Sequence, residues 1–419
     1  MKEVVIVGAG FAGLNAAKEL AHRGEVRVVL IDQKNHHLFQ PLLYQVATAG
    51  LNPADIAVPV RAQFSDAANV SVKLGRVESA DLAAKRLRLA GGEELAFDFL
   101  ILACGAQHSY FGKPEWEPYA PGLKTIEQAL EIRRRILSAF ENAENESDPE
   151  RQRALLTFVI VGGGATGVEL AGAIADISRT VLVKDFRRID PASARVVLVE
   201  AGPRLLPAFP EDLAARAARD LTRLGVEVRT SSLVELVDEN GVQIGGERLT
   251  AKTVLWAAGV QAERISRTLG VKLDRSGRIE VGPDLSIPGF PDVFVAGDLA
   301  HFDLGDGKVL PGLAPAAIQT GRTAARNVLA TLHGKARETF RYFDKGQLAT
   351  IGKRKAIGKI GRLELTGYLA WLGWLFVHIL YLVGFKNRLF VFVQWVWSYL
   401  FSKRGSRLIT STDWTSNRE

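Results

Sequence analysis

Two glycine-rich turns are the parts of this 419-residue chain whose residue types and spacing most directly indicate chemistry. Their glycines are Gly8, Gly10 and Gly13 in the first turn, and Gly162, Gly164 and Gly167 in the second. In such a turn the first glycine permits a tight bend, the second lets a pyrophosphate approach the backbone, and the third allows close packing of helix on strand. Free amide groups at the following helix N-terminus bind phosphate oxygens. Each turn therefore predicts a dinucleotide site.

An acidic residue follows each turn at the end of the next predicted strand. Asp32 lies 22 residues after the middle glycine of its turn, near the spacing expected for an acid that binds a ribose diol. Glu200 lies 36 residues after its middle glycine, because residues 179–193 look like an insertion between helix and strand. An acid at this position repels a 2′-phosphate and favours NADH over NADPH, although the nearby Arg204 weakens that preference.

The elements that position these turns are repeated along the chain. Residues 4–20 and 158–174 each have the pattern of an apolar strand, a glycine turn and a helix. Each half also closes with an apolar strand that runs into small residues, over 97–106 and 251–260. The economical interpretation is an α/β protein with two Rossmann-like dinucleotide-binding domains, with FAD in the first and NADH in the second.

Three further segments complete this predicted architecture. Residues 293–300 predict a buried strand ending at Asp298, which in two-dinucleotide flavoproteins contacts the flavin ribityl or phosphate oxygens and otherwise would only cap a turn. Residues 313–330 predict a helix with Pro315 in its first turn, where the missing N–H costs nothing. Residues 141–155 are charged and turn-rich, and they predict a surface connection between the two halves.

Composition narrows the classes of function. A hydrophobic fraction of 47% and a charged fraction of 24% are near globular averages, which excludes a disordered or fibrous chain. The single cysteine, Cys104, excludes a disulfide framework, a cysteine-based zinc site and a dithiol reductase, and we predict no metal site. The N-terminus enters a strand without a signal-peptide pattern, so we expect the protein on the reducing, cytoplasmic side.

The net charge of +7 is concentrated near the end of the chain. Residues 345–419 carry 12 Lys and Arg against 3 Asp and Glu, and five of the seven Trp. Basic residues that flank Trp-rich apolar runs indicate a membrane surface rather than nucleic acid. The runs 368–385 and 389–401, which Lys386 and Arg388 interrupt, predict two interfacial helices rather than a membrane span. Without a bundle of spanning helices we expect no proton pumping.

These motifs together resemble the type II NADH dehydrogenases, the single-subunit NADH:quinone oxidoreductases of bacterial membranes and some mitochondria. The matching stretches are residues 8–17, 36–51, 103–112, 161–172, 199–207, 256–260, 296–300, 313–321 and 367–389. Glycine turns are shared with many flavoproteins. The stretch HHLFQPLLYQVAT and the C-terminal stretch are more specific to this family.

The resemblance implies a glutathione-reductase-like fold and a homodimer that docks peripherally (as a monotopic protein) on the cytoplasmic face of the bacterial inner membrane. The implied parts are FAD-binding over 1–120, a connection over 121–156, NADH-binding over 157–282, a second FAD-binding part over 283–340, and membrane association over 341–419, with contact through about 365–405. The implied partners are NADH and a membrane quinone, ubiquinone or menaquinone, without nucleic acid.

The resemblance also implies which residues bind the cofactors. For FAD these are Gly8, Gly10, Phe11, Ala12, Gly13, Asp32, Gln33, Lys34, Leu43, Val46, Val77, Ala103, Cys104, Gly105, Asp298, Ala314, Ala316 and Ala317. For NADH these are Gly162, Gly164, Thr166, Gly167, Glu169, Glu200, Ala201, Ala258 and Gly259. Among the apolar residues of 36–51, Gln40, Tyr44 and Gln45 suit a flavin wall with a few polar contacts.

Three residues are implied to act in catalysis. Glu169 matches a glutamate proposed to assist proton transfer or to place the nicotinamide, and otherwise would only complement a helix dipole. Gln319 would donate a hydrogen bond to a quinone carbonyl, or be a solvated helix residue. Lys386 matches a basic position near the quinone or flavin, or is an interfacial anchor. His378, on an apolar helix, is expected to be satisfied by a neighbour.

Two positions depart from the family pattern. The usual Ala-Thr-Gly at the end of the first FAD part is Ala103-Cys104-Gly105 here, and the similar size of Cys should preserve the turn. The quinone motif, usually Ala-Gln-x-Ala-x-Gln, occupies 314–319 and keeps only its second glutamine, Gln319. The sequence therefore leaves the details of quinone contact open.

Two other functions are compatible with the sequence. One is a soluble NADH-dependent flavoprotein reductase that serves a protein acceptor such as a ferredoxin. The other is a flavoprotein whose NADH binding only signals redox state through dimerisation, similar to the apoptosis-inducing factors. A soluble reductase gains nothing from a Trp-rich apolar end, so the C-terminal stretch favours FAD-dependent NADH oxidation with quinone reduction.

Overall fold

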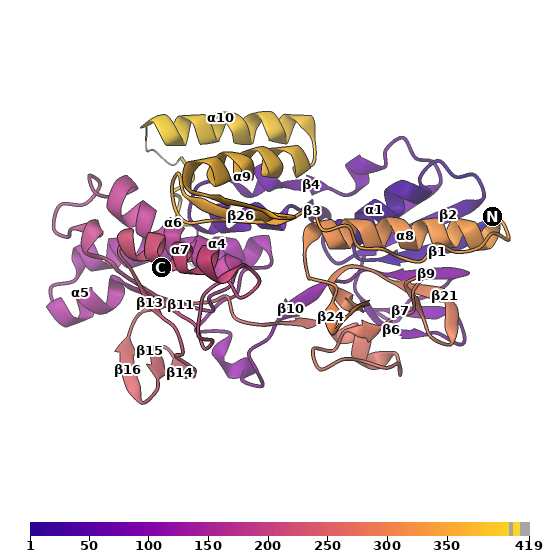
Figure 1. Cartoon of the computed structure of the whole chain (residues 1–419), viewed down its shortest axis with the longest axis horizontal. Helices are drawn as coiled ribbons and strands as arrows, with labels where there is room; N and C mark the ends of the chain where they lie inside the picture. The colour runs from indigo at the N-terminus through magenta and orange to yellow at the C-terminus, as the bar shows by residue number, and fades with distance from the viewer. Residues whose placement is uncertain (402–404, 411–419) are drawn as a thin grey trace, which may run out of the picture. The chain divides into compact units, whose positions relative to one another are not determined.

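The computed structural model describes residues 1–401 and 405–410, and the chain divides into two compact units (Figure 1). Unit 1 comprises Met1–Leu38, Ala57–Gln107 and Val260–Lys345. Unit 2 comprises Phe39–Ile56, His108–Gly259 and the chain from Gly346 onward. The two-domain α/β prediction is confirmed, because each unit is built around its own sheet of mainly parallel strands.

Unit 1 contains a six-stranded sheet in the order β20-β21-β9-β1-β2-β5. Its strands are β1 (Lys2–Val7), β2 (Val26–Asp32), β5 (Val70–Leu74), β9 (Phe99–Leu102), β20 (Ser286–Ile287) and β21 (Phe290–Val295). Alternate residues of the central strand β1 belong to two different cores, since Val4 and Ile6 face one and Val5 and Val7 the other. Such a strand is buried on both faces, which explains its unbroken apolar run.

Two helices, α1 (Phe11–Leu20) and α8 (Ala314–Leu332), cover one face of this sheet and pack against each other (Figure 1). Their contact is close, because a Cβ at Gly321 would lie 2.1 Å from the carbonyl oxygen of Ala12. A small sheet of β6 (Val77–Asp81), β7 (Arg86–Leu89) and β8 (Glu94–Ala96) covers the other face. The predicted helix over 313–330, with Pro315 in its first turn, is confirmed.

Unit 2 repeats the arrangement with a four-stranded parallel sheet in the order β13-β12-β11-β17. Its strands are β11 (Thr157–Val161), β12 (Arg195–Val199), β13 (Val226–Arg229) and β17 (Thr253–Trp256). Helices α6 (Ala165–Asp176) and α7 (Glu211–Arg223) contact these strands, and α6 continues into a π-helical turn at Ile177–Val181. On the other face lies an antiparallel sheet of β14 (Val234–Asp238), β15 (Gly241–Ile244) and β16 (Glu247–Thr250).

The predicted connection over 141–155 is largely exposed at the surface, but it is helical rather than turn-rich. Helix α4 (Ile126–Asn145) runs through it, and α5 (Pro149–Leu155) follows. A capping box between Thr125 and Gln128 begins α4, and the Asp148 side chain caps α5 with Pro149 in its first turn. The charges that suggested a loop lie on exposed faces of the two helices.

The C-terminal part of unit 2 is a three-stranded sheet followed by two apolar helices (Figure 1). The strands are β25 (Gln347–Thr350), β26 (Ala356–Ile360) and β27 (Leu363–Thr366), and the helices are α9 (Gly367–Tyr381) and α10 (Phe385–Phe401). The predicted pair of helices is confirmed, but the break is not at Lys386, which lies in the first turn of α10. The chain turns at Leu382–Gly384 instead, where Gly384 has a φ of 88°.

None of the helices in the described residues is long and apolar enough to cross a membrane. The predicted membrane-association region, 341–419, extends past these residues at 402–404 and 411–419. The remaining elements are short. They are β3 (His36–Leu38), α2 (Leu43–Ala47), α3 (Pro53–Ile56), β4 (Ala57–Pro59), β10 (Ala106–His108), β18 (Val260–Ala262), β19 (Ile279–Glu280), β22 (Ala300–His301), β23 (Asp303–Gly305), β24 (Lys308–Val309) and 3₁₀ turns at Gln40–Leu42, Arg61–Gln63, Pro114–Trp116, Pro191–Ser193, Arg264–Thr268 and Gly297–Leu299.

Candidate active site

In unit 1 the first glycine turn joins the end of β1 to the start of α1. Gly8 has a φ of 102°, and a Cβ there would lie 2.4 Å from the carbonyl oxygen of Ala103. A Cβ at Gly13 would lie 1.7 Å from the carbonyl oxygen of Gly8. Gly10 instead faces open space, with nothing within 4 Å of where its Cβ would be. The turn thus leaves room at the N-terminus of α1, where a pyrophosphate fits.

Asp32, at the end of β2, forms a hydrogen bond that holds this turn in place. Its carboxylate accepts the backbone N–H of Ala9 at 2.6 Å and that of Lys34 at 2.7 Å. Burial raises the pKa of Asp32 above its usual value, while these two N–H groups act in the opposite direction. The acid expected to bind a ribose is therefore also the acid that shapes the turn.

Several residues predicted to bind FAD meet in one small cluster. Ala12, Ala103 and Ala317 pack with Ala296, and Phe11 lies against them. They come from α1, the end of β9 and the start of α8, which are far apart in sequence. Because their side chains are methyl groups, the backbone of all three elements lies close to the turn. The carboxylate of Asp298 lies beside Gly312, whose Cβ would be 3.5 Å from it.

Other predicted FAD residues differ in exposure. Cys104 lies in unit 1 with its thiol beside the carbonyl oxygen of Val7, and burial raises its pKa to about 12. Gln33 is exposed, and Val77 is half-buried at the start of β6. Leu43 and Val46 belong to unit 2, where their side chains are fully buried in protein. A ligand contact from these two residues would therefore have to use their backbone.

His37, on β3, contacts the first glycine turn and was not assigned from the sequence. Its side chain is 2% exposed, and its Nδ1–H donates to the carbonyl oxygen of Ala9 at 2.9 Å. Its ring also meets that of Phe11 edge to face. Burial lowers the pKa of His37, so the ring is neutral at pH 7. The paired histidines of the family-specific stretch 36–51 were the available signal.

The second glycine turn, in unit 2, has the same steric contacts at its three glycines as the first. A Cβ at Gly162 would lie 2.6 Å from backbone atoms of Ala257 and Ala258, and one at Gly167 would lie 1.8 Å from the Gly162 carbonyl oxygen. Gly164, the residue before α6, again faces open space. Glycine spacing in the sequence thus predicted both turns for the right steric reason.

Glu200, at the end of β12, takes the place that Asp32 has in unit 1. Its carboxylate accepts the N–H of Gly163 at 2.6 Å and that of Gly202 at 2.6 Å. The predicted NADH residues Ala201 and Gly259 are exposed, and Thr166 and Ala258 are half-buried. This turn is therefore open to a ligand from solvent.

Phe111 is a second residue that the sequence reasoning missed. A Cβ at Gly259 would lie 2.5 Å from the Phe111 ring, so the ring lies over this glycine. Phe111 is 68% exposed and has a φ of 51°, which is uncommon for a non-glycine residue. Only its place in the family-like stretch 103–112 could have drawn attention to it.

Glu169, on the second turn of α6, lines a pocket of about 60 Å³ inside unit 2, which we call the Glu169 pocket. Its full lining is Tyr44, Gln45, Thr48, Gly50, Glu169, Ala173, Asp176, Thr180, Val181, Thr350, Gly352, Lys353, Trp395 and Ser398. Desolvation raises the pKa of Glu169 to about 8, although the backbone N–H of Thr350 lowers it. This carboxyl is therefore mostly protonated at neutral pH and able to donate a proton.

A chain of hydrogen bonds runs along this pocket to helix α10. The Thr350 hydroxyl and the Tyr44 hydroxyl lie 3.1 Å apart, and Gln45 Nε2 donates to the Tyr44 oxygen at 3.0 Å. The indole N–H of Trp395 donates to Gln45 Oε1 at 2.8 Å. The predicted polar contacts Tyr44 and Gln45 are thus bound to protein groups, as is Gln40, which donates to the Lys124 carbonyl oxygen.

The other two predicted catalytic residues lie in separate units. In unit 1, the Gln319 amide group donates to the carbonyl oxygens of Pro315 and Phe343, and its oxygen accepts the Phe343 N–H at 2.9 Å. In unit 2, Lys386 is exposed, with its ammonium 5.7 Å from the centre of the Phe390 ring. His378 bonds the Trp374 carbonyl oxygen at 2.7 Å, which confirms that a neighbour satisfies it.

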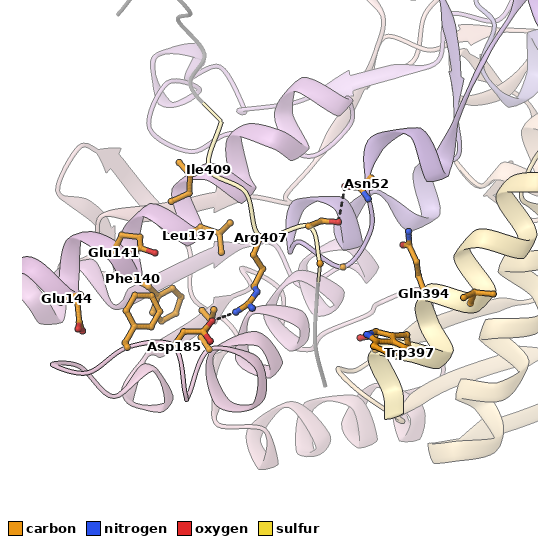
Figure 2. Close-up of a pocket in the computed structure, with 17 residues that line it drawn as sticks. Asn52, Leu137, Phe140, Glu141, Glu144, Asp185, Gln394, Trp397, Arg407 and Ile409 are labelled. Carbon is orange, nitrogen blue, oxygen red and sulfur yellow. Dashed lines mark hydrogen bonds and ion pairs between the residues drawn. The ribbon is translucent and has the colours of Figure 1, made fainter. Parts of the chain in front are cut away.

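A larger pocket, of about 970 Å³, lies in unit 2 between α4, the loop at 182–186, α10 and the chain at 405–409 (Figure 2). Arg407 pairs there with Asp185. Ser406 donates from its hydroxyl to Asn52 and accepts from Arg133 at its carbonyl oxygen. These contacts fasten the end of the described chain to the body of unit 2.

Comparison with family models matches two regions of the chain. The model described as pyridine nucleotide-disulphide oxidoreductase matches residues 2–321. The model described as the NDH2 C-terminal domain matches residues 345–404. The first region contains both glycine turns, and the second contains α9 and α10.

Two curated relatives align over most of the chain. A type II NADH:quinone oxidoreductase of Mycobacterium tuberculosis is 46% identical over 422 aligned positions, which cover 97% of this chain and 90% of the relative. A type II NADH:quinone oxidoreductase of Staphylococcus aureus is 30% identical and covers 87% of this chain and 91% of the relative.

Solved structures share the fold. NDH2 of Plasmodium falciparum, determined in complex with NADH, superposes with a TM-score of 0.88 at 19% identity, covering 98% of this chain and 100% of that one. A ferredoxin reductase of Rhodopseudomonas palustris gives a TM-score of 0.68 at 22% identity, covering 86% of this chain and 82% of that one. The better match is to the structure that also covers the C-terminal helices.

Proposed function

Because the chain belongs to the type II NADH:quinone oxidoreductase family, we propose that it is an FAD-dependent enzyme that oxidises NADH and reduces a quinone by two electrons. The observation that carries this proposal is the second glycine turn. Glu200 binds the backbone of this turn, and its middle glycine, Gly164, faces open space. The same chain also matches the family's C-terminal domain. Two dinucleotide turns in one chain fit a bound flavin and an exchanging nicotinamide.

The chain's own residues bind and orient the reactants. FAD, when bound, accepts hydride from NADH and passes two electrons to the quinone. The first turn and the alanine cluster would hold it at unit 1, and the second turn with Glu200 would hold NADH at unit 2. Glu169, protonated at neutral pH, would supply a proton to a quinone oxygen. The two remaining predicted catalytic residues, Gln319 and Lys386, stay proposals for quinone contact.

We further propose that α9 and α10 bind the membrane surface and admit a lipid-soluble quinone. Their exposed apolar residues support this: Tyr368, Leu369, Leu372, Phe376 and Leu380 on α9, and Phe385, Leu389, Phe390, Phe392, Val393, Val396 and Trp397 on α10. Exposed patches of this kind mark interaction surfaces. Lys386 and Arg388 beside them would anchor the helices at anionic headgroups.

The predicted homodimer, the cytoplasmic face of the membrane and the cofactor-based domain bounds are also part of the proposal. The domain bounds group residues by the cofactor they serve. The segments 39–56 and 108–120, grouped with the FAD-binding part, therefore belong to unit 2, and 260–282, grouped with the NADH-binding part, belongs to unit 1. A single cysteine agrees with a reducing compartment. Sedimentation of the detergent-purified protein would test the dimer.

Stopped-flow absorbance at the flavin band tests the central proposal. Detergent-purified protein is mixed first with NADH and then with a short-chain ubiquinone. We expect rapid bleaching by NADH and rapid recovery on addition of the quinone. Bleaching without recovery would contradict quinone reduction while leaving the cofactor assignments intact, and reduced ferredoxin formation would then be measured instead.

A further inference from the structure

Quinone reduction by NADH consumes one proton from water in each turnover. Hydride carries two electrons and one hydrogen from NADH, and a quinone must gain two electrons and two protons to become a quinol. NADH, one proton and quinone therefore give NAD⁺ and quinol. If Glu169 donates a proton, its carboxylate must be protonated again from solvent before the next turnover.

Helix α6 aligns a second carboxyl group with Glu169. Glu169, Ala173 and Asp176 are spaced at i, i+4 and i+7, so they lie on one face of the helix, and all three line the Glu169 pocket. The small side chain of Ala173 leaves the space between the two acids open. The acids are thus at two positions along a single pocket.

Thr180 marks a solvent-exposed end of the pocket on this face of the helix. Thr180, in the π-helical turn that follows α6, is exposed, whereas Asp176 is 9% exposed, Ala173 is 5% exposed and Glu169 is half-buried, so along the helix Asp176 lies between the exposed end and Glu169. The π-helical turn brings the Thr180 hydroxyl within 3.3 Å of Asp176 Oδ1. Such turns recur at functional sites. Asp176 therefore lies just behind the exposed end of the pocket and before Glu169.

The pocket is large and polar enough to hold water between the two acids. Its volume of about 60 Å³ exceeds the roughly 10–15 Å³ that one water requires. Hydroxyl groups of Tyr44, Thr48 and Thr350 line it, and Lys353 is the cationic group among the lining residues. A carboxyl, water and a second carboxyl form a chain along which protons can hop.

We propose that Asp176 is a proton relay that reprotonates Glu169 through water in the Glu169 pocket, with Thr180 at its entrance. This inference rests on the proposed function. In each cycle Asp176 takes a proton from solvent and gives it to pocket water, and that water protonates the Glu169 carboxylate. Both carboxyl groups return to their starting state, so no further reactant is needed. Tyr44 and Lys353 are the other titratable groups that face the route.

Transient kinetics of the Asp176→Asn variant test this inference in the full-length, flavin-loaded protein. We expect flavin reduction by NADH to keep its rate, because that step takes no proton from solvent. Reoxidation by a short-chain ubiquinone should slow by about tenfold, at the low end of what a lost acid–base group costs, and its solvent deuterium isotope effect should rise. Added formate or azide, which carry protons as small weak acids, should restore part of the rate.

Three further variants make the test specific. Asp176→Glu keeps a carboxyl group and should retain most of the reoxidation rate. Thr180→Val removes only the hydroxyl at the entrance and should give a smaller slowing of the same step, which covers the case that Asp176→Asn does not fold. Asp212→Asn makes the same chemical change at an exposed position of α7, and it should leave both half-reactions unchanged.

Each outcome separates the relay from the proposed function. If wild-type flavin is not reoxidised by quinone, the proposed function fails. If wild type is reoxidised and Asp176→Asn behaves identically, with no change in the isotope effect, the relay is wrong. A parallel loss of both half-reactions that weak acids do not restore would assign Asp176 a structural role and would also overturn the relay.

Discussion

The two glycine turns share their steric design but differ in what surrounds them. In both, the first and third glycines are held by backbone contacts, and an acid at the next strand end binds two backbone N–H groups. The turn of unit 1 packs against the buried alanine cluster, and His37 donates a hydrogen bond to it. The turn of unit 2 lies beside exposed residues, Ala201 and Gly259.

This difference matches two kinds of ligand, one that stays bound and one that leaves after each turnover. A cofactor that stays bound benefits from a closed binding site with tightly packed walls, because such a site slows dissociation. A substrate that must leave after every turnover benefits from an open site. Under the proposed function, we expect one duplicated element to serve both purposes, with the side chains outside the motif deciding which.

Replacing the third glycine should separate the two sites most strongly. In Gly13→Ala and Gly167→Ala the new Cβ would lie 1.7 Å and 1.8 Å from a carbonyl oxygen, which forces the helix away at a cost of about 3 kcal/mol or more. We expect Gly13→Ala to lose FAD, and Gly167→Ala to keep FAD but lose rapid bleaching by NADH. Flavin content after gel filtration and stopped-flow bleaching measure the two effects. Equal flavin loss in both variants would break the comparison.

Removing the acid of the open turn should weaken NADH binding. Glu200→Ala leaves the N–H groups of Gly163 and Gly202 without their carboxylate, and hydrogen bonds to charged groups contribute about 1.5–3 kcal/mol each. We expect the KM for NADH to rise by roughly tenfold or more, and NADPH to be discriminated against less. Steady-state rates with both nucleotides give the result, with exposed Glu211→Ala as the control. An unchanged NADH:NADPH ratio would contradict the assignment of Glu200.

The pH dependence of stability should reveal the protonated state of Glu169. Its pKa of about 8 in the fold exceeds that of an exposed carboxyl, so the folded state binds more protons between about pH 4.5 and 8. Stability from this group is therefore full at low pH and is lost as pH rises through this window. Wild-type Tm should fall more than that of Glu169→Gln between pH 5.5 and 8.5, by on the order of 5 °C. Parallel Tm curves would contradict a Glu169 carboxyl that stays protonated at neutral pH.

The substitution of Cys104 by Ala should have the smallest effect. Cys104 follows Ala103 at the end of β9, as Ala258 follows Ala257 at the end of β17, so the second turn already shows that alanine fits there. We expect Cys104→Ala to keep its flavin and to change the stability by less than about 1 kcal/mol. In the wild type, a pKa of about 12 should leave the thiol unreactive toward iodoacetamide at pH 8. Rapid labelling of the native protein would place the thiol elsewhere.

Most of the fold could be predicted from the sequence, because the patterns that indicate it are local. Glycine spacing, β-branched strands and a terminal acid are set within about thirty residues, and both turns, their strands and the helix over 313–330 formed as predicted. The charges of residues 141–155 predict a turn-rich connection, whereas the structure has the end of α4 and all of α5 there, two helices that begin at the caps Thr125 and Asp148. The break between the apolar helices was placed at charged Lys386, whereas backbone geometry at Gly384 determines it.

The site was less predictable, because its contacts join distant segments. Phe111 meets Gly259, and Tyr44 meets Thr350, only after the chain has folded. No spacing rule relates such positions. Asp176 could not be predicted for another reason. It lies two helical turns from Glu169, and this spacing indicates a functional link only because both residues line one pocket.

The bonds that Asp32 and Glu200 make to their own turns have a thermodynamic consequence. Each turn donates a backbone N–H to its carboxylate, from Ala9 to Asp32 and from Gly163 to Glu200, so a nucleotide does not have to order a flexible loop when it binds. Preorganisation of this kind removes an entropic penalty from association. It also means that the protein stripped of flavin should keep a ready site, and should regain its colour when FAD is added back.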